Sequence, residues 1–396
     1  MESTLRAKEK FVRTRALLTS SALIATAAMA APAMASHAIG GDPSTYGTIT
    51  IAVEGPLTGQ QASNGQDMLR GVRLAVQQYN AKGGFYGRKV RIVQANDKAD
   101  PSLAKSVANK VIKGPAVAVV GPYNSSVGLV NLPMYTRAKV VPVQMTSTDD
   151  TTGLGVTVQP KNSQISPVEF NYISKAFAPS KVSMLVDPSA YTQSMADRLE
   201  RSLKARGVLV TQIPISDTQT DFTPQINQAL TNNPTVVYLS TYFPQGAAIA
   251  KQLLATGNPA KCFAGLANQD PAFITQAGIP ASRNCVFSGV PDPSQFPTAR
   301  NYVKAYKKAF PGKTPGTWGT FTYDSANILF AAWKRAHDPF TYGKVLAQLK
   351  KTRNFAGATG KITINSRGNR PNVPVSILSV DARGDFNIIT TDRSRK

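Results

Sequence analysis

Two adjacent serines are the residues of this chain that most directly suggest chemistry. Ser125 and Ser126 lie in the stretch VVGPYNSSVG, just after a short apolar run that ends in Gly-Pro. Paired hydroxyls at the end of an expected strand can act as a nucleophile, as a helix cap, or as a clamp that donates hydrogen bonds to an anion. The surrounding sequence has to discriminate among these three.

The nucleophile interpretation lacks the partners that it needs. The only histidines are His37, near the N-terminus, and His337, at an expected helix end beside two basic residues. No G-x-S-x-G elbow surrounds the serines, and no Walker loop or G-x-G-x-x-G follows the first expected strand. Asp149 and Asp150 form a carboxylate pair, but adjacent residues are poorly disposed to share one site. We expect no catalytic residue, no cofactor and no metal site.

Strand and helix patterns alternate along most of the chain. Apolar runs rich in β-branched residues predict strands at residues 49–53, 90–93, 116–120, 140–143, 182–186, 208–213, 236–240, 262–265 and 286–289. Helical patterns separate them, which favours parallel sheets with helices on both faces. The two series change over near residues 157–163, so they predict two lobes. After residue 291 the pattern is helical and then closes with strands.

The first 35 residues have the pattern of an export signal. Five basic residues precede a short apolar run at residues 16–31, and Ala33-Met34-Ala35 offers small residues for cleavage. A membrane span needs about 18 or more apolar residues, and this run is shorter and interrupted. No cysteine lies near the cleavage site, so we expect no lipid anchor. The mature protein is predicted to be periplasmic or extracellular.

Cys262 and Cys285 are the only cysteines. Export places them in an oxidising compartment, which favours a disulfide, whereas zinc would need four ligands. Two free, buried thiols are the alternative.

The strongly basic composition comes mainly from a shortage of acids. The formal net charge is +23, and +20 without residues 1–35, which hold five basic and two acidic residues. Only Glu54, Glu169 and Glu200 are glutamates in the remaining chain. Lysines and arginines are dispersed, with no basic run interleaved with aromatics, so nucleic acid is not the expected partner. We hypothesise adaptation to an acidic exterior; adhesion to an anionic cell surface and drift in composition are the alternatives.

The stretch RGVRLAVQQYNAKGGFYGRKVRIVQANDKADPSLAKSVANKVI, residues 70–112, resembles the branched-chain amino acid-binding proteins of ABC transporters, the leucine/isoleucine/valine type of periplasmic solute-binding protein. That family shows a helix ending in N-A-x-G-G, then G-R-x-V, a strand, an Asp-Pro pair and another helix. The likeness continues in weaker form from about residue 47 to residue 389. Gly83 and Gly84 suit a left-handed helix end, and Asp100 can cap a helix that begins at Pro101.

The resemblance implies a fold as well as a family. It is the α/β type I periplasmic binding protein fold, with two Rossmann-like lobes of parallel sheets joined by a three-strand hinge. Residues 46–162 and 290–372 are then expected in lobe 1, and residues 163–289 and 373–392 in lobe 2, after the signal peptide of residues 1–35.

A carboxylate clamp is the resulting interpretation of the serines. In open α/β sheets ligands sit beyond the carboxyl ends of the strands, where Ser125 and Ser126 are expected. Hydroxyls and free N–H groups at a helix start suit a carboxylate without a buried cation. Simple capping remains the alternative. The resemblance places Ser147 and Thr148 at the corresponding point after the next strand, where the family contacts its ligand.

The resemblance implies four further ligand-binding residues. Asn64, in the loop after the first strand, falls where family members place a residue over the ligand. Tyr191 and Tyr242 match aromatic residues that reach in from the second lobe. Trp318 matches a wall of the apolar part of the pocket, with ordinary packing as the alternative.

One departure from the family concerns the ligand's ammonium group. Amino acid-binding members hold that group with a glutamate from the second lobe, but the stretch FAGLANQD places Ala267 there. An unpaired buried ammonium costs several kcal/mol. Asp270 can substitute only if the register slips, and it also fits an N-cap before Pro271. The ligand is therefore expected to be a small carboxylate, either an amino acid or an organic or aromatic acid.

The function implied is an extracytoplasmic solute-binding protein that delivers its ligand to an ABC importer. We expect a monomer that meets the transporter permease. A ligand-sensing receptor domain of the same fold is the alternative, and an exported enzyme is less favoured because histidines and catalytic motifs are scarce.

Overall fold

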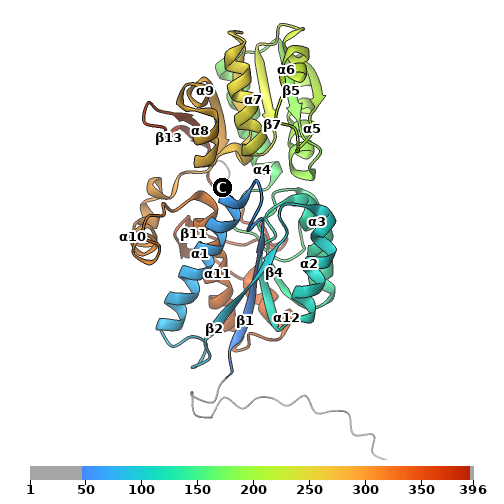
Figure 1. The fold of residues 1–396 in the computed structure, drawn as a ribbon. Coiled ribbons are helices and arrows are strands. Elements are labelled where there is room, and N and C mark those ends of the chain that lie inside the picture. Colours follow the sequence, from blue (N-terminus) through green and yellow to red (C-terminus); the bar gives the residue numbers. More distant parts are fainter. Residues whose placement is uncertain (1–46, 393–396) are drawn as a thin grey trace, which may run out of the picture. The chain divides into compact units, whose positions relative to one another are not determined.

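The smaller of the two large β-sheets is fully parallel, with the strand order β2-β1-β3-β4 (Figure 1). The computed structural model describes residues 47–392, so the expected signal peptide lies outside the described residues. The strands of this sheet are β1 (Ile49–Gly55), β2 (Val90–Asn96), β3 (Ala116–Val120) and β4 (Val141–Val143). Burial along the whole of β1 reflects its central place between β2 and β3.

The second sheet has seven strands in the order β13-β12-β9-β8-β7-β5-β6. They are β5 (Lys181–Val186), β6 (Leu209–Pro214), β7 (Val236–Ser240), β8 (Lys261–Ala264), β9 (Cys285–Gly289), β12 (Val375–Val380) and β13 (Phe386–Asp392). The predicted parallel arrangement is found from β5 to β9. It does not extend to the edge, because β12 runs antiparallel to β9 and is joined to β13 by a short turn, which forces antiparallel pairing.

Helices separate the strands, as the alternating pattern predicted. Those around the first sheet are α1 (Ala62–Ala81), α2 (Pro101–Lys113), α3 (Ser125–Arg137), α10 (Arg300–Ala309), α11 (Thr317–Ala336) and α12 (Tyr342–Lys350). Those around the second are α4 (Asn162–Tyr172), α5 (Ala190–Lys204), α6 (Thr223–Leu230), α7 (Phe243–Ala255), α8 (Pro271–Ala277) and α9 (Ile279–Asn284). A short antiparallel hairpin, β10 (Phe355–Gly357) and β11 (Gly360–Ile362), completes the fold.

Two local predictions for helix ends are confirmed. The Asp100 side chain accepts a hydrogen bond from the N–H of Ser102, and Pro101 occupies the first turn of α2. Gly83 and Gly84, after α1, both have positive φ angles, of 94° and 69°. A Cβ atom on Gly84 would lie 2.1 Å from a backbone oxygen, so only glycine fits this turn.

Helices α1 and α11 pack at very short range. A Cβ atom on Gly71 would lie 1.9 Å from the carbonyl oxygen of Gly319, so the contact depends on the missing side chain. The buried Asp67 carboxylate of α1 accepts hydrogen bonds from the N–H groups of Gly316 and Gly319 at the start of α11. This contact fixes the first turn of α11, which carries Trp318.

The chain passes between the two sheets three times. The crossing segments, residues 157–161, 290–292 and 363–374, contain no paired strand, so these connections are loops rather than the three strands expected. Two of them touch, since the N–H of Thr157 donates to the carbonyl of Gly368 at 2.8 Å. The lobe boundaries stay a prediction, which the membership of the two sheets supports.

Cys262 and Cys285 form a disulfide between paired positions of the adjacent strands β8 and β9. In the chain-entropy account, closing a loop of this length stabilises the folded state by about 3 kcal/mol. Replacing both cysteines by alanine should therefore lower the free energy of unfolding by about that amount in urea titrations. A reducing agent should destabilise the parent protein similarly and leave the variant unaffected. Equal stability of the oxidised parent and the variant would contradict this expectation.

Candidate functional site

A buried cavity lies where the carboxyl ends of strands from both sheets meet. Its lining comes from the segments after β3, β4, β7 and β8, from one crossing segment and from the starts of α5 and α11. The lining residues are Tyr123, Ser125, Met145, Ser147, Gln159, Tyr191, Tyr242, Leu266, Ala267 and Trp318. The cavity measures about 10 Å³, room for about one water molecule, so a solute enters only when the surrounding side chains or lobes move apart.

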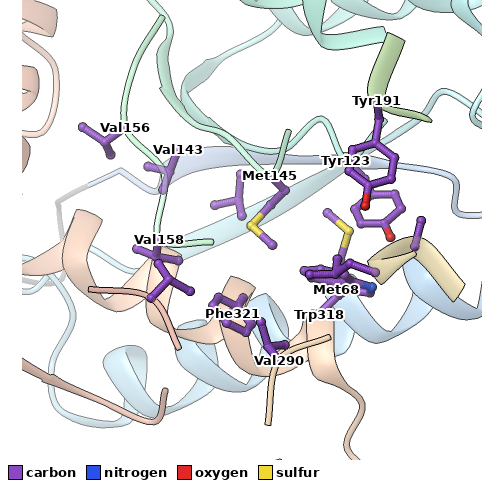
Figure 2. Close-up of a cluster of buried hydrophobic side chains, with 14 of the residues drawn as sticks. Met68, Tyr123, Val143, Met145, Val156, Val158, Tyr191, Val290, Trp318 and Phe321 are labelled. Carbon is purple, nitrogen blue, oxygen red and sulfur yellow. The ribbon is translucent and has the colours of Figure 1, made fainter. Parts of the chain in front are cut away.

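Aromatic rings supply most of the walls. The ring centroids of Tyr123 and Trp318 lie 5.4 Å apart, and those of Tyr191 and Tyr242 lie 5.8 Å apart. The ring centroids of Tyr123 and Tyr242 lie 6.3 Å apart, and this contact joins the two lobes. Figure 2 shows Tyr123 and Tyr191 reaching into the same space, with Met68 and Trp318 below them in this view. Such rings offer large apolar faces to an apolar or aromatic ligand body.

The cavity lining carries no formal charge. Burial raises the pKa of Tyr123 and of Tyr191 well above the usual value, so both phenols stay protonated and can donate hydrogen bonds. The Nδ2 atom of Asn64 donates to the Tyr123 hydroxyl at 3.4 Å, which leaves that hydroxyl's proton for another acceptor. The site therefore offers neutral donors to a ligand.

Ser125 and Ser126 have different surroundings although they are neighbours. The buried Ser125 lines the cavity, and its Oγ accepts from the N–H of Thr148 at 3.3 Å, so its proton remains free. Ser126 does not line the cavity; its Oγ accepts from the N–H of Ala190 at 2.9 Å, at the start of α5 in the other lobe. Within the described chain, neither serine is hydrogen-bonded to a histidine or a carboxylate that could activate it as a nucleophile.

Ser147 lines the cavity, but its hydroxyl is already used. Its Oγ donates to the carbonyl of Pro160 at 2.8 Å and accepts from Nε2 of Gln159 at 3.0 Å. The Oγ1 of the neighbouring Thr148 donates instead to the Oδ2 of Asp150 at 3.5 Å. These two residues therefore support the site and leave Ser125 as the main hydroxyl donor on this side.

The buried Lys161 holds the backbone of the segment that follows β4. Its Nζ donates to the carbonyls of Thr146 and Thr148 at 3.1 Å each, to Thr151 Oγ1 at 2.8 Å and to Gln144 Oε1 at 3.2 Å. Burial lowers the pKa of Lys161 to about 7. Sequence reasoning missed this residue, because only the fold brings these oxygens around one nitrogen.

The structure brings five of the eight predicted ligand-binding residues to the cavity and leaves three outside its lining. Ser125, Ser147, Tyr191, Tyr242 and Trp318 line it. The residues outside the lining are Asn64, Ser126 and Thr148. The expected loop position of Asn64 was wrong, because α1 already begins at Ala62 and the side chain reaches Tyr123 instead.

Four lining residues were not predicted. Tyr123 stands in the same quoted stretch as the serines, and an aromatic residue two positions before them was a usable signal. Met145, Gln159 and Leu266 carry no comparable signal, because their places depend on how β4, the first crossing segment and β8 end in space.

Ala267 lines the cavity, and Asp270 does not. The Asp270 carboxylate caps α8 through the N–H of Ala272 and accepts from the Ser63 hydroxyl at 2.8 and 2.9 Å, across to the other lobe. Burial raises the pKa of Asp270 to about 6. Of the two roles considered for Asp270, the N-cap is confirmed, and its oxygens are already occupied.

The family known as periplasmic binding protein matches residues 48–385. The chain belongs to the periplasmic binding protein family. It is 28% identical over 347 residues to the Leu/Ile/Val-binding protein BraC3 of Rhizobium johnstonii, covering 86% of this chain and 94% of that protein. The predicted membership in a solute-binding family of the leucine/isoleucine/valine type is thereby confirmed.

Solved structures share the fold at lower identity. The leucine-binding protein LivK of Thermotoga maritima superposes with a TM-score of 0.81 at 24% identity, covering 87% of this chain and 98% of that one. A solute-binding protein of R. palustris in complex with benzoate gives a TM-score of 0.78 at 17% identity, with 87% and 96% covered. The predicted type I periplasmic binding protein fold is confirmed by these likenesses.

Between residues 47 and 392, no helix has the length and apolar character to cross a bilayer. The same part of the chain holds no group of three histidine, cysteine or acidic residues placed to bind a metal ion.

Proposed function

We propose that this chain works outside the cytoplasm, where it captures a small carboxylate-bearing solute between its lobes and delivers it to the permease of an ABC importer. The observation that carries the proposal is the cavity between the two sheets, lined by neutral hydroxyl donors and four aromatic rings. Ser125 and Tyr123 can donate to a carboxylate without any buried cation. The protein is proposed to act as a monomer after removal of its signal peptide.

Lobe closure is the proposed capture step. Besides the contact of Tyr123 with Tyr242 and the ion pair of Arg198 with Asp149 at 2.8 Å, three hydrogen bonds already join the lobes: Ser63 with Asp270, Ser126 with the N–H of Ala190, and Gln245 Nε2 with Gln60 Oε1 at 3.0 Å. When the lobes open, water can take the place of each partner in these hydrogen bonds. Breaking them therefore exposes no large apolar interface at these points. The loops that cross between the sheets supply the hinge.

The first experiment is a ligand screen. Thermal-shift measurements with amino acids and with aliphatic and aromatic carboxylates should identify acids that raise the melting temperature, because a ligand that binds only the folded state stabilises it. The amide and methyl ester of each binding acid should be inactive. Hydrolysis of model esters that depends on Ser125 would instead support the enzyme alternative.

Ser125 and Ser126 form a matched pair for mutation. Ser125→Ala should weaken binding of the acid by about 10- to 150-fold, the effect of losing a hydrogen bond to a charged group. Ser126→Ala should weaken it less and should not change the discrimination between acid and amide, because Ser126 contacts Ala190 rather than the cavity. Calorimetric titration of both variants measures the difference, and equal losses would contradict the assignment of the carboxylate to Ser125 rather than Ser126.

A further inference from the structure

One acceptor at the cavity has no hydrogen-bond partner. Gln159 is only 1% exposed and lines the cavity, yet its Oε1 atom is unpaired. A buried polar atom without a partner is costly, and one that also faces a cavity can be satisfied by a group bound there. The feature therefore points to a ligand group that completes the hydrogen bonding.

The orientation of the Gln159 amide is fixed by its neighbours. Its Nε2 donates to the carbonyl of Met145, which can only accept, so the nitrogen must face that way. Nε2 also donates to Ser147 Oγ, whose own proton goes to the carbonyl of Pro160. The amide oxygen is consequently presented as an acceptor, and the ligand has to supply the proton.

A free hydroxyl from the other lobe lines the same cavity. Tyr191, at the start of α5, is 6% exposed, and the backbone N–H of Ala267 lies near its hydroxyl oxygen and acts to lower its pKa. That contact uses the oxygen as an acceptor, and no acceptor takes the hydroxyl proton, so the proton is available for a ligand. An acceptor on one side and a donor on the other match a group that can both give and accept a hydrogen bond. A hydroxyl group does this without carrying charge.

We propose that Gln159 and Tyr191 form a polar subsite for a hydroxyl group, so that the natural ligand is a hydroxylated carboxylic acid without an ammonium group. This inference rests on the proposed function, since it assumes that the carboxylate is held elsewhere in the cavity. Ala267 disfavours an amino acid, because no residue of the lining carries a negative charge that would offset a buried ammonium. The aromatic walls suit an apolar or aromatic body.

Two matched sets of acids test the subsite with the protein as it exists. In each set only the group on the α-carbon changes, from ammonium to hydroxyl to hydrogen. The first set is leucine, 2-hydroxy-4-methylpentanoate and 4-methylpentanoate. The second set is phenylalanine, 3-phenyllactate and 3-phenylpropanoate. In at least one set, the hydroxy acid should bind about 10-fold more tightly than the acid with hydrogen, and at least about 100-fold more tightly than the amino acid. Titration calorimetry gives the three affinities.

Each outcome is decisive for the subsite. Tighter binding of the amino acid overturns the inference but leaves the proposed function intact, and so does equal binding of the hydroxy acid and the acid with hydrogen. Binding of none of the six also overturns the inference. The proposed function fails separately, only if the wider screen finds no carboxylate at all.

Variants connect the preference to the two residues. Gln159→Leu and Tyr191→Phe should each reduce the preference for the hydroxy acid over the acid with hydrogen to about twofold or less. The ratio is measured within one variant, so partial loss of stability does not affect it. Gln193→Leu, an exposed glutamine on α5, is the matched control and should keep the full ratio. An unchanged ratio in both test variants would overturn the assignment.

Discussion

Replacing Ala267 by glutamate should give the protein the ability to bind leucine. Ala267 lines the cavity on the second lobe, at the place where amino acid-binding relatives are expected to hold the ligand ammonium. A buried ammonium without a partner costs several kcal/mol, and a facing carboxylate removes that cost. We expect the affinity for leucine to rise by at least about 100-fold and the affinity for the hydroxy acid to fall, because its neutral hydroxyl now faces a buried negative charge.

The uncharged variant Ala267→Gln separates charge from size. It fills the same space as the glutamate, so any loss caused by crowding in this small cavity should appear in both variants. Only the glutamate variant should gain leucine binding. Calorimetric titration with leucine and with 2-hydroxy-4-methylpentanoate measures the switch. If both variants remain folded and the glutamate variant binds leucine no better than the glutamine variant, Ala267 is not the ammonium position.

Acidification from pH 7 to pH 5 should increase the free energy of unfolding. Burial raises the pKa of Glu169 to about 7, although hydroxyls of Tyr238 and Ser288 donate to it. Burial likewise raises the pKa of Glu54 to about 8, with the nearby Asp97 adding repulsion. The folded state then binds more protons than the unfolded state, so stability is greatest below the unfolded pKa values and is lost as pH rises through the folded ones.

Other groups limit the pH window. Burial lowers the pKa of Lys161 to about 7, so above pH 7 this residue binds fewer protons in the folded state than in the unfolded state. Its contribution to stability therefore increases with pH above pH 7, opposite to that of the two glutamates, and changes little below pH 7. Surface hydrogen bonds lower the pKa of Asp381 to about 2. The stability that ionised Asp381 contributes is therefore lost only when the pH falls below the usual pKa range of aspartate. Maximum stability is therefore expected between about pH 4 and pH 6.

Glu169→Gln tests the source of this trend. Glutamine imitates the protonated carboxyl, so the stability of the variant relative to the parent should fall by about 2 kcal/mol between pH 7.5 and pH 5. Glu200→Gln is the matched control, because it makes the same chemical change at a surface residue, which is paired with Lys204 at 2.6 Å. Denaturant titrations at each pH give the values. A parent protein that loses stability steadily from pH 7 to pH 5 would exclude the acidic-exterior hypothesis.

The structure also sharpens the basic character of the surface. Among the described residues, seven acidic side chains are buried, whereas Lys161 and Arg370 are the only buried basic ones. The acids that composition already makes scarce are thus partly withdrawn from the surface. Buried carboxyls that are easily protonated suit a protein exposed to acid, which is the hypothesis that the composition suggested.

The sequence by itself determined the fold class and most of the elements. Alternating apolar runs and helical patterns are local signals, and they predicted the strands from β1 to β9 and most of the helices between them, though not α4 or α9. The caps at Asp100 and Gly83 were predictable because they depend on a few adjacent residues. The resemblance in residues 70–112 indicated the family, and the two serines indicated one end of the site.

Only the tertiary structure decided which hydroxyls are available. Ser125 and Ser126 are chemically identical and adjacent, but a helix turns neighbouring side chains in different directions, so one faces the cavity and the other the start of α5. The free oxygen of Gln159 follows from contacts with Met145 and Ser147, which lie 12 or more residues away and meet it only after folding. Hydrogen-bond availability is a property of neighbours in space, and sequence patterns record neighbours along the chain.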